Sequence, residues 1–343
     1  MRTALRAGVV FTVCAAATGC QVYDFEPVTP LAIAQTTQKN NVTAKKEKPN
    51  LMILLDKSGS MNEPLPGGTG CNNCRFPNCN EATCPTRMGA ARRAMDDFLM
   101  NNSSVARMGL TVYPRGSVCE AATSAEVLVP VKPATDDPAD LQTWANSINL
   151  QIQAPCNTNP GPTCPIGGTP TGGSLSFVGT IPEINDPNRE DFVLLLTDGL
   201  PNCNMNNPNR CGAPGTADEA SCRCTLLAGQ CGMNITDQFC RLGCLDQDGA
   251  VEAVRELRSE TAHAGGIKTI VVGFGSDFDP SNPNSAGFLV LNAMARAGGF
   301  QRTCPNGTNA ECGTGGVCDM SSGQGICQTA FYSASNQTEL IAA

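Results

Sequence analysis

Three short stretches of this 343-residue chain carry Ser, Thr and Asp side chains in positions where they could do chemistry. They are residues 56–60 (DKSGS), residues 167–171 (GGTPT) and residues 196–199 (LTDG). Hydroxyl and carboxylate groups are hard oxygen donors, and Mg2+ takes about six oxygens in a near-octahedral array, several of them from water. The three stretches therefore point to a divalent-cation site.

Two apolar runs must position these side chains. Residues 51–55 and residues 192–196 are continuously apolar, which is typical of strands buried on both faces of a parallel sheet. One oxygen-rich stretch directly follows each run, and the third lies in a glycine-rich loop. Ligands of open α/β sheets bind beyond the carboxyl ends of the strands, so the three stretches are expected at one edge of the sheet.

Taken together, the three stretches resemble the metal-ion-dependent adhesion site of von Willebrand factor A domains, the fold shared by integrin I domains. Residues 271–275 (VVGFG) also look like a later strand of that family, and the resemblance covers about residues 50–343, interrupted by insertions. It implies a cation, Mg2+ with Mn2+ or Ca2+ as alternatives, whose open position takes an Asp or Glu carboxylate from a protein or cell-surface partner. The metal-site residues that it implies are Asp56, Ser58, Ser60, Thr169 and Asp198, the hydroxyls binding directly and the carboxylates directly or through water.

The amino terminus indicates export. Residues 1–19 combine two arginines with an apolar run too short to span a bilayer, as signal peptides do. Residues 17–20 (ATGC) resemble the lipobox of bacterial lipoproteins, which implies that Cys20 is lipidated; cleavage of an ordinary secretory signal is the alternative. Gln21 in place of Asp favours the outer membrane. Residues 20–49 have no helical or strand period and are interpreted as a flexible tether.

The remaining elements predict a doubly wound α/β fold with a mostly parallel central sheet flanked by helices, of the vWA or Rossmann-like kind. Further strands are expected at residues 109–113, 127–131, 267–273 and 330–332, and helices at residues 86–100, 138–148, 250–263, 288–297 and after Ser335. Residues 50–343 would form one domain with cysteine-rich insertions at 62–85, 200–247 and 300–328. The first two insertions should crown the metal edge, and the third insertion and the tether should lie at the opposite end.

The 20 cysteines indicate an oxidising compartment. Without Cys14, lost with the signal, and Cys20, an even number remains for disulfides. The first and third insertions could close internally, whereas the middle one has an odd count, so at least one bridge should leave it. A bridge between Cys156 and Cys164 would brace the Thr169 loop. The disulfide candidates are Cys71, Cys74, Cys79, Cys84, Cys119, Cys156, Cys164, Cys203, Cys211, Cys222, Cys224, Cys231, Cys240, Cys244, Cys304, Cys312, Cys318 and Cys327.

Composition excludes several classes of function. The net charge of −8 argues against nucleic acid as a partner, and a single histidine, His263, leaves little general-base chemistry. The Cys71 and Cys74 spacing suits zinc, but a disulfide is preferred, and Asp246 is expected to cap a helix rather than open a calcium loop.

The sequence therefore predicts a non-enzymatic, lipid-anchored envelope protein that binds a protein or a surface through its metal. It looks like the cysteine-rich vWA lipoproteins of gliding soil bacteria, some of which are motility adhesins. Two alternatives remain open: a structural scaffold or assembly subunit whose metal only stabilises the loops, and an enzyme or an enzyme accessory subunit.

Overall fold

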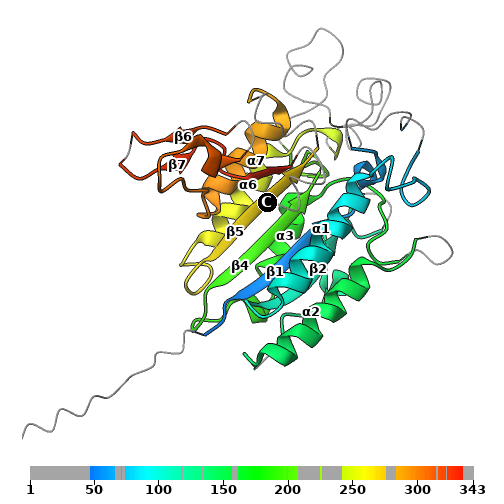
Figure 1. Cartoon of the computed structure of the whole chain (residues 1–343), viewed down its shortest axis with the longest axis horizontal. Coiled ribbons are helices and arrows are strands. Elements are labelled where there is room, and N and C mark those ends of the chain that lie inside the picture. Colours follow the sequence, from blue (N-terminus) through cyan, green and yellow to red (C-terminus); the bar gives the residue numbers. More distant parts are fainter. Residues whose placement is uncertain are drawn as a thin grey trace, which may run out of the picture. The chain divides into compact units, whose positions relative to one another are not determined.

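A computed structural model describes most of the chain after the tether (Figure 1). The described residues are 47–65, 71, 74–116, 119–132, 135–156, 161–198, 200–207, 225, 242–275, 283–313, 316–321 and 323–334. Residues 46–343 form one compact unit. The predicted signal peptide, Cys20, the tether up to residue 46, the helix after Ser335 and five cysteines of the middle insertion lie outside the described residues.

A six-stranded sheet with the order β3-β2-β1-β4-β5-β8 forms the centre of the molecule. All its neighbouring strands pair in parallel except β3 with β2. The strands are β1 (Asn50–Asp56), β2 (Arg107–Tyr113), β3 (Val127–Val129), β4 (Asp191–Thr197), β5 (Ile267–Phe274) and β8 (Tyr332–Ala334). The predicted mixed α/β fold with a mostly parallel sheet is confirmed.

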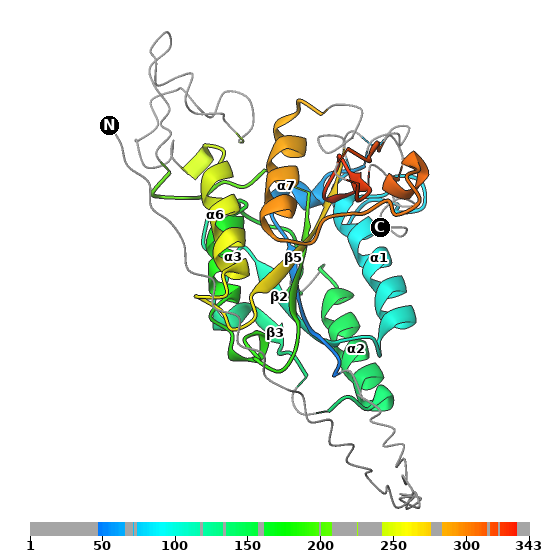
Figure 2. The same cartoon turned by 90° about the vertical axis from the view of Figure 1, so that its left-hand side faces the viewer.

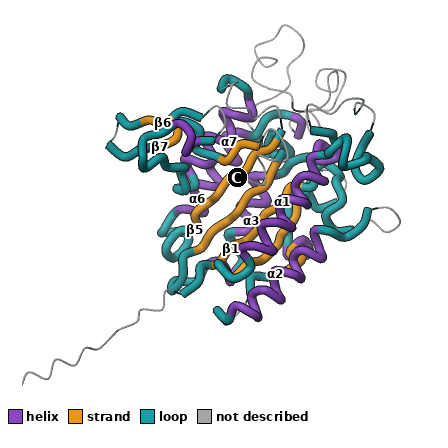
Figure 3. Tube along the Cα trace, in the orientation of Figure 1, coloured by secondary structure: helices purple, strands orange, loops and turns teal. Residues whose placement is uncertain are grey.

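Helices cover both faces of this sheet, as Figure 2 shows with the sheet between two helical layers. The tube in Figure 3 shows the same elements coloured by type. The helices are α1 (Arg87–Asn102), α2 (Pro138–Ile152), α3 (Thr171–Val178), α6 (Gln247–Arg258) and α7 (Ala286–Ala297). Short 3-10 turns and a two-stranded ribbon complete the described elements: η1 (Gly59–Asn62), η2 (Ser124–Glu126), η3 (Pro182–Ile184), η5 (Asn309–Cys312), β6 (Cys318–Asp319) and β7 (Ile326–Cys327).

Strand β1 divides the core between these layers. All seven of its residues are buried, and successive side chains point to opposite faces. Ile53 and its face pack with residues of α1 and α2, whereas Met52 and Leu54 pack with residues of α3, α6 and α7. A continuous apolar run is therefore required in β1, because neither face meets water.

Helix α3 was not predicted. Its sequence, residues 171–178 (TGGSLSFV), contains two glycines, which are poor helix formers. A Cβ at Gly172 would lie 3.2 Å from the backbone of Gly249, so glycine permits the close approach of α3 to α6. The predicted helix 250–263 ends earlier, at Arg258, and the chain turns through Gly265 and Gly266, which both have positive φ.

The described ends of the first two insertions lie near the carboxyl edge of the sheet. Asn50 pairs with Asp191 and Leu55 with Leu196, so the chain enters at the amino edge of the sheet while Asp198 lies at the carboxyl edge. The first insertion starts and ends beside Pro64 and Thr86, which form a bridge at the carboxyl edge. The described part of the middle insertion contacts the same edge.

The third insertion was predicted to lie at the end opposite to the metal edge, but its described residues run along the side of the sheet instead. It begins beside Thr269, near the start of β5, where Gly299 forms a bridge, and it returns where Tyr332 pairs with Val272. Arg296 of α7 donates a hydrogen bond to the carbonyl of Gln328, so the insertion lies against α7 (Figure 1). Because β8 pairs only with the carboxyl half of β5, the preceding segment must run along the edge of the sheet.

Six disulfides join described cysteines. They are Cys71–Cys84, Cys74–Cys79, Cys119–Cys203, Cys156–Cys164, Cys304–Cys318 and Cys312–Cys327. The first and third insertions thus close internally, and Cys203 links the middle insertion to the loop after β2. Cys244 is also disulfide-bonded. The sulfurs of Cys304, Cys312 and Cys327 gather within 4.8 Å, but as disulfide sulfurs they offer no thiolates to a metal.

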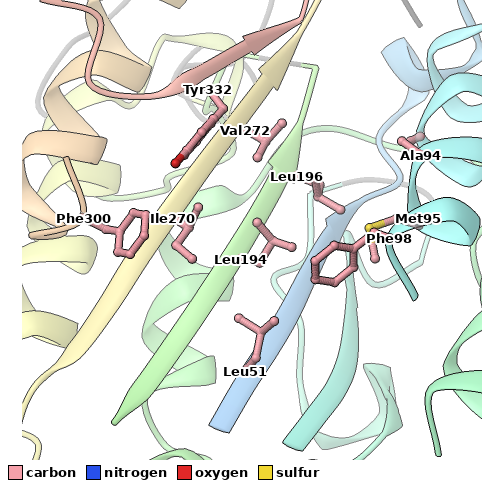
Figure 4. A pocket seen from close by; sticks show the side chains of 11 residues that line it. Leu51, Ala94, Met95, Phe98, Leu194, Leu196, Ile270, Val272, Phe300 and Tyr332 are labelled. Carbon is pink, nitrogen blue, oxygen red and sulfur yellow. The ribbon is translucent and has the colours of Figure 1, made fainter. Parts of the chain in front are cut away.

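One part of the sheet on the α1 side is not covered by α1 or α2. It forms an apolar groove of about 230 Å3 over β1, β4 and β5, with Phe300 and Tyr332 at one side and α1 at the other (Figure 4). Its remaining lining residues are Leu51, Ala91, Ala94, Met95, Phe98, Leu194, Leu196, Ile270 and Val272.

Within the described part of the chain, no helix combines the length and the apolar character that crossing a membrane requires.

Candidate metal centre

The carboxyl ends of β1 and β4 bring two aspartates together. Asp56 is the last residue of β1, and Asp198 directly follows β4, its parallel neighbour in the sheet. After Asp56 the chain turns into η1, which places Ser58 at its N-cap position and Ser60 inside it. Residues that are distant in sequence therefore meet at one edge of the sheet.

Hydrogen bonds join these four residues into a chain. The backbone N–H of Ser58 donates to Asp56 Oδ1 at 2.7 Å. The hydroxyl oxygens of Ser58 and Ser60 lie 3.0 Å apart, and the Ser60 hydroxyl donates to Asp198 Oδ1 at 3.0 Å. Asp56, Ser58 and Asp198 are buried, whereas Ser60 is half-buried and faces the surface. We call these four residues together with Thr169 the oxygen cluster.

Backbone contacts bring the loop that carries Thr169 next to the turn that carries Ser58 and Ser60. The N–H of Gly59 donates to the carbonyl of Gly167 at 2.8 Å, and the N–H of Thr169 donates to Asn202 Oδ1 at 2.7 Å. Gly167 has a φ of 79°, and a Cβ at Gly168 would lie 2.4 Å from the sulfur of Cys203. Gly167 is therefore required by its left-handed backbone conformation, and Gly168 by its close contact with the Cys119–Cys203 disulfide.

The electrostatics of the oxygen cluster are unfavourable for two bare carboxylates. Burial, together with repulsion from Asp198, raises the pKa of Asp56 to about 7, although a hydrogen bond from the Thr197 hydroxyl to Asp56 Oδ2 at 2.6 Å opposes the rise. Burial also raises the pKa of Asp198, opposed first by Arg87, whose Nη1 lies 2.9 Å from Asp198 Oδ2. Burial and mutual repulsion therefore disfavour the ionised form of both carboxyls, although one guanidinium is in contact with Asp198.

These residues fit a hard divalent cation. The hydroxyls of Ser58 and Ser60 and the two carboxylates are oxygen donors of the kind that Mg2+ prefers, and a cation would offset the repulsion between the carboxylates. Ser58, Ser60 and Thr169 would supply neutral oxygens, and Asp56 and Asp198 would supply the charge. All five residues predicted from the sequence lie in this region of the structure.

Three neighbouring residues were missed by the sequence analysis. Thr197 and Asn202 flank Asp198 in the sequence, so a search for hydroxyl and amide side chains next to the LTDG stretch could have found them. Arg87 is 111 positions away from Asp198, and it belongs to the first turn of α1. No local pattern signals its contact with the oxygen cluster, because the contact depends on how α1 packs on the sheet.

Other polar candidates from the sequence lie outside the oxygen cluster. His263 follows α6 and precedes β5, which places it toward the amino edge of the sheet, where its Nδ1 lies 2.6 Å from Asn185 Oδ1. Asp246 occupies the N-cap position of α6, as predicted, and accepts a hydrogen bond from Asn204 Nδ2 at 2.9 Å. Neither residue contributes to a calcium loop or to a nucleophile–base pair among the described residues.

The fold and the oxygen cluster define an α/β protein with a disulfide-braced polar edge.

No protein-family model and no curated protein sequence matches the chain. Among solved structures it is similar to the PilB minor pilin from Streptococcus sanguinis, with 17% identity over 87% of this chain and 60% of that one and a TM-score of 0.45. It is also similar to the pilus adhesin SpaC from Lactobacillus rhamnosus GG, with 15% identity over 86% and 30% of the two chains and a TM-score of 0.41.

A third similar structure holds three N-terminal domains of the type V pili tip protein Mfa5 from Porphyromonas gingivalis, with 13% identity over 72% of this chain and 45% of that one and a TM-score of 0.36. The chain thus spans less than two thirds of the length of each of these structures. These findings correct the sequence-based assignment to von Willebrand factor A domains and to motility adhesins of gliding bacteria. No family model supports that assignment, and the similar structures are described as pilus adhesins and a minor pilin.

Proposed function

We propose that the protein is a non-catalytic binding protein of the bacterial cell envelope that holds a divalent cation in the oxygen cluster and captures a partner carboxylate with it. The observation that carries the proposal is the pairing of two buried aspartates, Asp56 and Asp198, beside the hydroxyls of Ser58 and Ser60 at the carboxyl edge of the sheet. Mg2+ is the cation that this donor set favours, with Mn2+ or Ca2+ as alternatives.

The hydroxyls determine what the bound cation can do. Neutral oxygens from Ser58, Ser60 and Thr169 add no negative charge to that of the two carboxylates, so an anionic oxygen from a partner can bind at an open position. Thr197 and Asn202 position the oxygen cluster by hydrogen bonds to Asp56 and to the Thr169 backbone. The half-buried Ser60 marks the side from which a partner would approach.

The chain's entry point gives the proposal an orientation. Glu47 and Lys48 are tied to the amino edge of the sheet, where Arg189 pairs with Glu47 at 3.2 Å and donates to the Lys48 carbonyl at 2.7 Å. The oxygen cluster lies at the other edge. A lipid anchor at Cys20 would therefore leave the oxygen cluster facing away from the membrane.

Binding with and without the cation tests this function. Surface or partner capture from envelope extracts should be lost in EDTA and restored by Mg2+, and Asp56→Ala should abolish it. Asp246→Ala is the matched control, because Asp246 is also a buried carboxylate but lies outside the oxygen cluster. Capture that persists in EDTA and in Asp56→Ala would overturn the proposal.

A structural role for the cation is the second candidate function. The Cys119–Cys203 disulfide next to the Thr169 loop favours this candidate, because a cross-link there would stiffen the edge. In that case the protein would be an envelope scaffold or assembly subunit. Asp198→Ala would then lower the thermal stability without any selective loss of binding.

A further inference from the structure

Arg87 is fixed at the oxygen cluster from a different element. It is the first residue of α1, after the N-cap Thr86, and its backbone N–H donates to the carbonyl of Glu63 at 2.9 Å. Its side chain is 14% exposed, with Nη1 at 2.9 Å from Asp198 Oδ2 and Nη2 at 3.5 Å from Glu63 Oε2. The guanidinium therefore lies between a buried carboxylate of the oxygen cluster and an acidic side chain nearer to the surface.

This contact divides the two oxygens of Asp198. Oδ1 accepts from the Ser60 hydroxyl, whereas Oδ2 accepts from Arg87. One oxygen thus faces the hydroxyl donors and the other is held by a permanent positive charge, because an arginine does not deprotonate in proteins. Arg87 and a bound cation would both be drawn to the same carboxylate, so their charges oppose each other.

We propose that Arg87 is a specificity-determining residue of this site, which weakens cation binding and in return keeps the cation-loaded site positive for an anionic ligand. This inference rests on the proposed function. Two carboxylates neutralise a divalent cation, and Arg87 adds a charge at 2.9 Å from Asp198 that would make the loaded site attract a carboxylate. Glu63 offsets this charge only in part, because it lies farther from the guanidinium, at 3.5 Å, and is 39% exposed to screening solvent. The charge of Lys57 interacts with those of Glu126 and Asp56 and is present in every variant compared below.

Opposite effects on two affinities test the inference. Arg87→Met should tighten Mg2+ binding, measured by titration calorimetry, about tenfold, because it removes one charge near the cation. The same change should weaken acetate binding to the Mn2+-loaded protein about tenfold, measured by paramagnetic relaxation of the acetate methyl protons. Arg87→Lys keeps the charge and should leave the Mg2+ affinity close to that of the wild type.

The control is Arg93→Met on the same helix, since Arg93 pairs with Glu81 at 3.0 Å, away from the oxygen cluster. It should change neither affinity. Weaker or unchanged Mg2+ binding in Arg87→Met, with the variant still folded in a thermal melt, would overturn the inference while the metal site stands. Absence of Mg2+ binding to the wild type would overturn the proposed function itself.

Discussion

The hydrogen bond from Thr197 to Asp56 should be worth more when Asp56 is ionised. The Thr197 hydroxyl is buried, lies 2.6 Å from Asp56 Oδ2 and lowers the pKa of that carboxyl. Thr197→Val removes the donor and keeps the shape of the side chain. A hydrogen bond to a charged group contributes about 2 kcal/mol, and one to a neutral group about 1 kcal/mol.

The pH dependence follows from the raised pKa of Asp56, about 7 in the folded protein against an ordinary value of 3.8. Because the folded-state pKa is the higher one, the carboxyl favours folding at low pH, and this contribution is lost as the pH rises through about 7. Without Thr197 the pKa rises further, so the loss extends to higher pH. Thr197→Val should therefore lower the free energy of unfolding by about 1 kcal/mol near pH 5.5 and about 2 kcal/mol near pH 8.

Urea denaturation in EDTA at the two pH values measures this difference. The matched control is Thr269→Val in β5, because Thr269 is equally buried and its hydroxyl has no hydrogen-bond partner among the described residues. Its substitution should cost nothing or stabilise the protein. An equal loss for Thr197→Val at both pH values, or an equal loss for the two variants, would refute the reasoning.

Three further predictions concern other parts of the molecule. Burial raises the pKa of Asp191 to about 6, so the stability that this carboxyl contributes at low pH is lost as the pH rises through 6. In urea titrations between about pH 4 and 7, the unfolding free energy of the wild type should therefore fall about 2 kcal/mol more than that of Asp191→Asn. Replacing both Cys119 and Cys203 by Ser should lower the unfolding free energy by about 3 kcal/mol and weaken Mg2+ binding in calorimetry, since the disulfide lies against the Thr169 loop. Cys20→Ser should move the protein from the membrane fraction to the soluble fraction of fractionated cells, and unchanged membrane association would exclude lipidation at this position.

The elements with strong apolar patterns were predictable from the sequence. Strands β1 and β4 are apolar runs because nearly all of their side chains are buried, and the N-cap at Asp137 followed by Pro138 marks the start of α2. The order of the parallel strands then places Asp56 and Asp198 at one edge. The positions of the oxygen cluster residues were therefore within reach of sequence reasoning.

Features that depend on packing were not predictable. Helix α3 forms despite Gly172 and Gly173, because Leu175 and Val178 are buried against the core and Gly172 lets α6 approach. The third insertion runs along the side of the sheet because β8 pairs only with the carboxyl half of β5, and this short pairing is not visible in the sequence. The contact of Arg87 with Asp198 arises only when α1 is packed on the sheet, so no spacing in the sequence reveals it.

Direct titration of the protein with Mg2+ tests the central claim most directly. Calorimetry at about pH 8, where Asp56 is ionised, should show one cation bound for each chain, and the binding should disappear in Asp56→Ala but persist in Asp246→Ala. The absence of binding by the wild type, or equal binding by Asp56→Ala, would contradict a cation site in the oxygen cluster.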